Sequence, residues 1–208
     1  MCHLPRNHPN GKRDRERVPA VRSAIRRVGA TVAAMPPSKK QKSEETGAIV
    51  YHEPKVMAEI GCNHMGQLEI AKELLTLAKQ CGCEYGKFQK RCPKELLTPE
   101  QYAAPHPNPR NAYGDTYGAH REFLELTVDQ HRELKEHCDS IGLGYSCSVW
   151  DMTSAKELVS LNPDLIKVGS PSNQHWEMQK VLRDTYSGDV RAAERINPHL
   201  PPLLRTSL

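Results

Sequence analysis

Aromatic residues and long apolar runs are scarce in this sequence of 208 residues. Aromatic residues make up 5% of the chain and hydrophobic residues 38%, whereas there are 16 prolines. No run approaches the roughly 18 apolar residues of a membrane-spanning helix, so the protein is expected to be soluble. The length suits one domain of roughly 100 to 200 residues, together with segments that cannot pack into it.

A cysteine pattern typical of a zinc site is also missing. The number of cysteines is odd, and several lie inside apolar runs, which favours buried thiols in a reducing compartment. Cys62 and His64 could offer two metal ligands, but a structural zinc site needs four. The seven cysteines are Cys2, Cys62, Cys81, Cys83, Cys92, Cys138 and Cys147.

Positive charge is concentrated at the start of the chain. Residues 1–45 hold eleven lysines and arginines against four acidic residues, whereas the whole chain has a net charge of +4. The rest of the chain is therefore net acidic, and we interpret residues 1–48 as a disordered basic leader. No aromatic residue is interleaved with these charges, so a nucleic-acid-binding arm ranks last among the interpretations. The cytoplasm is the expected location, with organelle targeting by the leader as the alternative.

Apolar strands and amphipathic helices alternate through the middle of the chain. Short apolar segments closed by glycine or following proline predict strands, and apolar residues at helical spacing predict helices. Thr127 and Gln130 have the spacing of a capping box at the start of one of these helices. The strands are expected at residues 56–60, 84–89, 143–149 and 164–168, and the helices at residues 68–78, 128–141, 154–161 and 173–183.

Repeated strand-helix units predict an α/β fold with a parallel sheet covered by helices. Four units fit either an open doubly wound sheet or about half of an eight-stranded barrel, and periodicity alone does not decide between them. The pattern fails from about Val190, so we expect the domain at residues 49–190 and a Pro-rich tail at residues 191–208. Residues 91–126 form the one long connection, which is expected to be functional or disordered.

Charged side chains stand near the ends of three expected strands. Lys87 and Gln89 share one face of the second strand, because alternate side chains point the same way. Glu59 lies near the end of the first strand, and Lys167 lies in the fourth, with Ser170 just beyond it. Two lysines against one glutamate, at strand ends where parallel barrels build active sites, favour an anionic ligand. The alternative is that Glu59 only pairs with one of the lysines inside the fold.

Six short motifs occur in order between residues 55 and 190. They are Ala58-Glu59-Ile60-Gly61-Cys62-Asn63-His64-Met65-Gly66, Lys87-Phe88-Gln89, Leu97-Thr98-Pro99-Glu100-Gln101-Tyr102, Tyr117-Gly118-Ala119-His120-Arg121 with Leu124-Glu125-Leu126, Ser148-Val149-Trp150-Asp151, and Ile166-Lys167-Val168-Gly169-Ser170. Together they closely resemble the N-acetylneuraminate (sialic acid) synthase family, which includes synthases of related nonulosonic acids.

The resemblance implies the N-terminal part of a TIM barrel that condenses phosphoenolpyruvate with an N-acetylhexosamine, such as N-acetylmannosamine or its 6-phosphate. It also implies that Glu59 is the catalytic carboxylate and that Lys87 and Lys167 hold the anionic groups of phosphoenolpyruvate, with Ser170 as a further donor. The substrate-binding residues that it implies are Lys87, Gln89, Lys167, Ser170 and Asn63.

The chain departs from the family pattern in ways that bear on activity. The family uses a divalent metal, manganese or magnesium, held by two histidines on later barrel strands, and no histidine here stands in a matching motif. In the family, an acidic residue often lies two positions after the serine that matches Ser170. In this chain that position is Ser172. Family members form homodimers with a further C-terminal domain. The alternative to a synthase is therefore a non-catalytic truncated isoform or pseudoenzyme that binds an anion or a partner.

Overall fold

A parallel sheet of five strands organises the part of the chain that the structure, a computed structural model, describes, residues 54–192. The strand order in the sheet is β1-β2-β3-β4-β5, the same as the order along the chain. The expected basic leader and most of the expected tail lie outside the described residues. The strands are β1 (Met57–Gly61), β2 (Tyr85–Lys90), β3 (Gly144–Val149), β4 (Leu165–Val168) and β5 (Asp189–Arg191).

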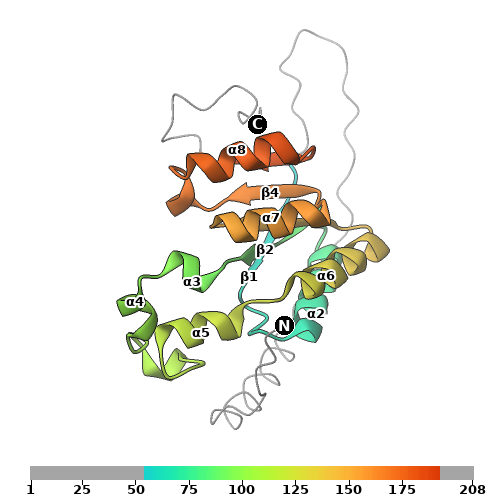
Figure 1. The fold of residues 1–208 in the computed structure, drawn as a ribbon. Coiled ribbons are helices and arrows are strands. Elements are labelled where there is room, and N and C mark those ends of the chain that lie inside the picture. The colour runs from blue at the N-terminus through green and yellow to red at the C-terminus, as the bar shows by residue number, and fades with distance from the viewer. Residues whose placement is uncertain (1–53, 193–208) are drawn as a thin grey trace, which may run out of the picture.

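The helices that connect these strands form one layer (Figure 1). Right-handed crossovers between strands in sequential order bring every connecting helix to the same face of the sheet. Contacts between helices run from α2 to α6, from α6 to α7 and from α7 to α8. A doubly wound sheet would instead reverse its strand order and carry helices on both faces. The fold is therefore part of an α/β barrel. These helices are α2 (Leu68–Gln80), α6 (Val128–Ile141), α7 (Met152–Leu161) and α8 (Trp176–Thr185).

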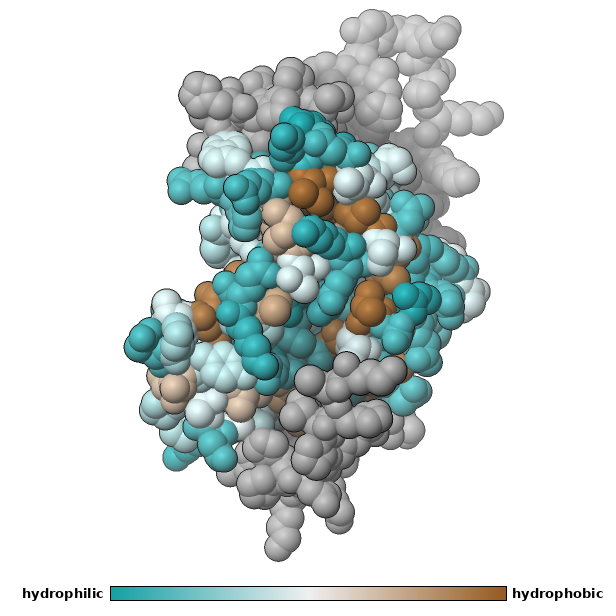
Figure 2. Space-filling model, viewed as in Figure 1, coloured by the Kyte–Doolittle hydropathy of each residue, from teal (hydrophilic) through white to brown (hydrophobic). Residues whose placement is uncertain are grey.

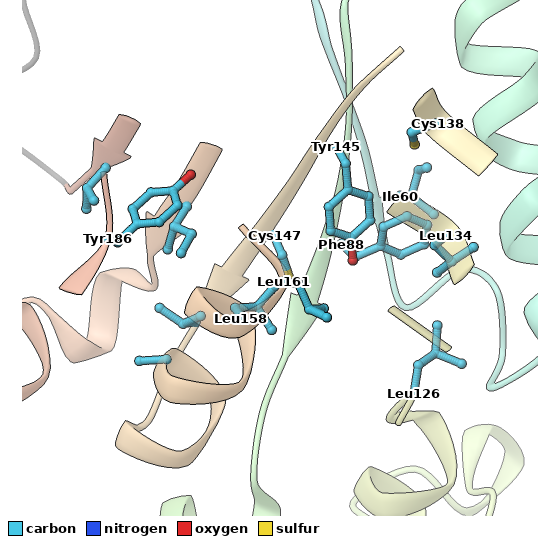
Figure 3. Packing of buried hydrophobic residues seen from close by; sticks show 14 of the residues in the cluster. Ile60, Phe88, Leu126, Leu134, Cys138, Tyr145, Cys147, Leu158, Leu161 and Tyr186 are labelled. Carbon is cyan, nitrogen blue, oxygen red and sulfur yellow. The ribbon is translucent and has the colours of Figure 1, made fainter. Parts of the chain in front are cut away.

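The hydrophobic core lies between the sheet and this helix layer (Figure 3). Phe88 of β2 and Tyr145 of β3 are fully buried, and their rings stack with centroids 5.9 Å apart. Leu134 of α6 and Leu158 of α7 are also fully buried in the same cluster. Because side chains alternate along a strand, filling one face with these residues turns Lys87 and Gln89 to the other.

The boundaries of several helices follow local capping chemistry. The predicted capping box is confirmed, because Thr127 and Gln130 bond each other's backbone amides at the start of α6. The last helix does not begin at residue 173, where the sequence pattern predicts its start. Helix α8 begins at Trp176, and the His175 ring accepts the capping hydrogen bond from Met178, whereas Asn173 ends the short 3-10 helix η2 (Ser170–Ser172).

Two segments hold more structure than the sequence pattern indicates. A fifth strand, β5, pairs with β4 at the point where the pattern was expected to fail. Its three residues are too few to show a period of two, and only their pairing defines them as a strand. The long connection contains α3 (Pro93–Leu96), α4 (Pro99–Ala103), a 3-10 helix η1 (Pro109–Asn111) and α5 (Tyr117–Leu124).

Polar residues cover most of the face shown in Figure 2, and apolar residues lie between them in separate groups. Among the described residues, the large apolar side chains that are exposed are Val56 and Trp176. Helices long and apolar enough to cross a membrane are not found within residues 54–192.

Two histidines are buried beside the core aromatic rings. The His131 ring lies against Phe88, with its Nδ1 atom 2.5 Å from the Tyr145 hydroxyl, and the His64 ring lies 5.8 Å from that of Phe88. Burial lowers the pKa of His64 to about 4 and that of His131 to about 3. Both imidazoles are therefore neutral in the folded protein at neutral pH.

We predict that mildly acidic pH destabilises this fold through these two buried histidines. In the unfolded chain a histidine has a pKa of about 6.5, so the unfolded state gains protons first as the pH falls below that value. Each histidine should lower the free energy of unfolding by on the order of 2 kcal/mol between pH 7 and pH 5. Urea unfolding at both pH values measures the loss. His131→Gln should unfold more easily at pH 7 but show a smaller pH dependence, and an unchanged pH dependence would contradict the assignment.

Candidate active site

An ion pair joins the ends of the first two strands. The register of β1 with β2 sets Glu59 beside Lys87, and Lys87 Nζ lies 2.6 Å from Glu59 Oε2. The Gln89 amide nitrogen donates to the other carboxylate oxygen at 3.3 Å. The Lys87 side chain is 13% exposed and that of Glu59 50%, so the pair opens to solvent on the Glu59 side. Three of the expected site residues therefore form one cluster.

Gly61 shapes the backbone next to this cluster. The register of β1 shifts between Glu59 and Gly61, and Gly61 has a positive φ of 56°, which a residue with a side chain rarely adopts. A Cβ atom at this position would come within 3.4 Å of the Glu59 carboxylate and 3.5 Å of the Gln89 amide. Glycine therefore allows the bulge that brings these two side chains together at the end of β1.

A row of polar residues continues across the sheet from Gln89. In the strand register, Gln89 of β2 is paired with Ser148 of β3, and Ser148 with Lys167 of β4. Paired residues of neighbouring strands lie on the same face, so Lys167 lies with Lys87 on the face that the helix layer does not cover, which we call the open face. Within residues 54–192, no ion pair with an N–O distance up to 4.0 Å includes Lys167. Among the described residues, this face therefore carries a cation that has no carboxylate partner.

The other two expected substrate-binding residues lie in the loops after β1 and β4. Ser170 is exposed at the start of η2, immediately after the end of β4, as expected. The Asn63 amide donates to the carbonyl of Ile60 at 2.9 Å, so this side chain closes the turn after β1. Ser172, where the family often has an acidic residue, is buried and donates to the Trp150 carbonyl at 2.6 Å. Its contact is structural.

A buried ion pair that sequence reasoning missed lies beside the cluster. Arg91, just after β2, has its Nε atom 2.7 Å from a Glu125 carboxylate oxygen, and its backbone amide donates to the other oxygen at 3.0 Å. The two side chains are only 8% and 9% exposed. Burial raises the pKa of Glu125, an effect that the Arg91 charge opposes. Glu125 belongs to one of the six motifs, but its partner Arg91 is 34 residues away in sequence, so a local pattern does not indicate the pair.

Arg91 also connects two other loops at this end of the sheet. Its guanidinium group donates to the Cys62 sulfur at 2.5 Å and lies 5.9 Å from the centre of the Trp150 ring. The next residue, Cys92, donates its amide to the Asp151 carboxylate at 2.8 Å, and the same carboxylate caps α7. The loops after β1, β2 and β3 are thus held to one another.

The described residues do not supply a metal site. Cys62 is bonded to Arg91, and His64 Nδ1 accepts from the Gly66 amide, so these two residues have separate partners. No group of three or more His, Cys, Asp or Glu side chains within residues 54–192 could hold a metal ion. The family's divalent metal therefore has no fitting ligand set in this part of the chain.

We predict that Glu125→Gln destabilises the fold by about 3 kcal/mol or more, because it leaves the buried Arg91 charge unpaired. Glu133→Gln is the matched control. Glu133 pairs with Lys72 at the surface and is 49% exposed, so its loss should cost about 1 kcal/mol or less. Urea unfolding of both variants gives the comparison. Equal losses of stability in the two variants would show that the buried Arg91–Glu125 pair contributes no more than the surface pair.

Comparison with known proteins identifies relatives of this chain. The chain is 35% identical to N-acetylneuraminate-9-phosphate synthase of Homo sapiens over 121 residues, which cover 58% of this chain and 33% of that protein. It is 36% identical to N-acetylneuraminate-9-phosphate synthase of Drosophila melanogaster over 129 residues, 60% of this chain and 33% of that protein. The chain therefore spans about a third of the length of these relatives.

A solved structure supports the fold. The N-acetylneuraminic acid (sialic acid) synthetase of Leptospira borgpetersenii serovar Hardjo-bovis, in complex with citrate, superposes with a TM-score of 0.54 at 17% identity, covering 71% of this chain and 46% of that chain. The partial TIM barrel expected from the motifs is thus confirmed. The model of the NeuB family matches residues 74–187, more than half of the sequence. The chain belongs to the NeuB family, and the resemblance to sialic acid synthases is confirmed.

Proposed function

We propose that this chain provides the phosphoenolpyruvate-binding part of a NeuB-type synthase site. The site joins phosphoenolpyruvate to an N-acetylhexosamine, N-acetylmannosamine or its 6-phosphate, and yields a sialic or related nonulosonic acid. The relatives support this reaction by name, since they include N-acetylneuraminate-9-phosphate synthases and an N,N'-diacetyllegionaminic acid synthase of Campylobacter jejuni. The observation that carries the proposal is the open face on which Glu59, Lys87 and Lys167 lie together.

The charges on this face suit a ligand with two anionic groups. Phosphoenolpyruvate carries a carboxylate and a phosphate, and charge-assisted hydrogen bonds to such groups are the strong ones. Lys87 already faces the Glu59 carboxylate at 2.6 Å, so it is shared between Glu59 and the ligand. Lys167, which has no carboxylate partner among residues 54–192, supplies a charge that an anionic ligand would neutralise. Ser170 adds a hydroxyl donor at the adjoining strand end.

Glu59 is the acid-base group of the proposal. The electron pair of the C2–C3 double bond of phosphoenolpyruvate forms the new bond to the sugar aldehyde carbon, and the aldehyde oxygen becomes a hydroxyl by gaining a proton. Water adds at C2 and gives up one proton, which balances the proton gained by the aldehyde oxygen. The C2–O bond to phosphate then breaks, the C2 hydroxyl becomes the carbonyl of the product, and its proton leaves with the phosphate. Glu59, half exposed beside Lys87, contacts the sugar and takes the proton from the water. Positioning of two substrates contributes much of the acceleration in such a site.

The first test of this function is a titration of the chain with phosphoenolpyruvate by isothermal calorimetry. Lys167→Met should weaken binding by about tenfold or more, because a hydrogen bond to a charged group is typically worth more than 1.4 kcal/mol. Lys180→Met on the outer face of α8 removes the same charge from an exposed position and should bind as wild type does. Wild-type protein that does not bind phosphoenolpyruvate would contradict the proposal.

The second test distinguishes the role of Glu59 from that of the residues that bind the anion. Glu59→Gln removes the carboxylate that competes for Lys87, so phosphoenolpyruvate should bind as well or up to about fivefold tighter, whereas Lys87→Met should weaken binding. Near-wild-type thermal unfolding should accompany the Glu59 change. If Glu59→Gln unfolds the protein, Glu59 is instead a structural partner of Lys87.

The condensation is tested by incubating the chain with phosphoenolpyruvate, N-acetylmannosamine and manganese while following phosphate release. Release that requires both substrates would support the reaction. Phosphoenolpyruvate binding without sugar-dependent release would favour the alternative, a chain that binds an anion without turnover.

A further inference from the structure

Strand β5 brings a second cation next to Lys167. Arg191 is the last residue of β5, and the register pairs it with Lys167 of β4. The family model ends at residue 187, so the likeness to the family assigns Arg191 no role. The sequence pattern also gave no reason to single it out, because β5 is only three residues long.

The burial of the neighbouring residues decides which way Arg191 faces. Val190 is 8% exposed and is paired with Ile166, which is fully buried, and both belong to the hydrophobic core beneath the helices. Side chains alternate along a strand, so Arg191 and Lys167 both lie on the opposite, open face. Lys167 is partly buried and Arg191 is exposed. The row on this face therefore consists of Gln89, Ser148, Lys167 and Arg191 across four strands.

These two cations are paired in the strand register, and neither has an acidic partner in the part of the chain that the structure describes. Like charges at directly opposite strand positions destabilise a sheet. Within residues 54–192, no ion pair up to 4.0 Å includes either of them, and the Glu59 carboxylate is bonded to Lys87 on the first two strands. Asp189 shares this face two positions earlier on β5, in register with Leu165. A bound anion would relieve the repulsion at the carboxyl ends of these strands.

We propose that Arg191 and Lys167 together bind the phosphate group of the phosphoenolpyruvate, an inference that rests on the function proposed above. A phosphate dianion matches two positive charges. The planar guanidinium group of Arg191 offers two parallel N–H donors to phosphate oxygens, and the Lys167 ammonium acts as a point charge beside it. This assignment leaves Lys87 on the Glu59 side of the site for the carboxylate, which separates the two anionic groups across the sheet.

The experiment titrates the full chain with three probes: inorganic phosphate, phosphoenolpyruvate and pyruvate, which has the carboxylate alone. Arg191→Met should weaken the binding of phosphate and of phosphoenolpyruvate by about tenfold or more, with little effect on pyruvate. Arg191→Lys keeps the charge but loses the paired donors, so its affinity for these two probes should lie between that of wild type and that of Arg191→Met. Arg132→Met is the control for net charge, because Arg132 lies on the exposed side of α6 and pairs only with Asp129 nearby. Circular dichroism of each variant checks the fold.

The outcomes separate this inference from the proposed function. If Lys167→Met weakens phosphate binding but Arg191→Met does not, the inference is overturned and the anion site stands. A larger effect of Arg191→Met on pyruvate than on phosphate would also overturn it, because the arginine would then hold the carboxylate. Wild-type protein that binds neither phosphate nor phosphoenolpyruvate would overturn both.

Discussion

The two-sided character of the parallel strands is the constraint on which the rest of the structure depends. One face of each strand is buried beneath the helix layer, as Phe88, Tyr145 and Ile166 show, and the residues between them must therefore face the other way. Because the strands run parallel and β2 to β5 pair without a register shift, polar residues of these four strands lie in one row. Core packing and site assembly thus follow from the same alternation.

Charge on the open face is unevenly distributed, and this asymmetry decides which kind of ligand the face suits. Glu59 neutralises Lys87 at one side of the sheet, whereas Lys167 and Arg191 stand together at the other. A purely structural network would be expected to balance its charges, since unpaired charge is costly to hold near a protein interior. This surplus of positive charge is what the proposed anionic substrate would neutralise.

The loops at the carboxyl ends of the strands are held by contacts that the strands themselves do not provide. Arg91 meets Glu125 at the end of the long connection, Cys62 after β1, and the ring of Trp150 after β3. A buried ion pair of this kind adds specificity of arrangement more surely than net stability. Because Arg91 directly follows the last residue of β2, these contacts hold the loop at the end of the strand that carries Lys87 and Gln89.

The sequence alone determined the α/β class, most strand positions and the candidate residues Glu59, Lys87, Gln89 and Lys167, because local periodicity and ordered motifs depend only on neighbouring residues. It did not reveal Arg91 with Glu125, the His131 and Tyr145 contact, or the pairing of Arg191 with Lys167. Each of these joins residues far apart in the chain or in an element too short to show a period. The tertiary structure decided them, because only the register of the sheet and the packing of the loops bring such residues within reach of one another.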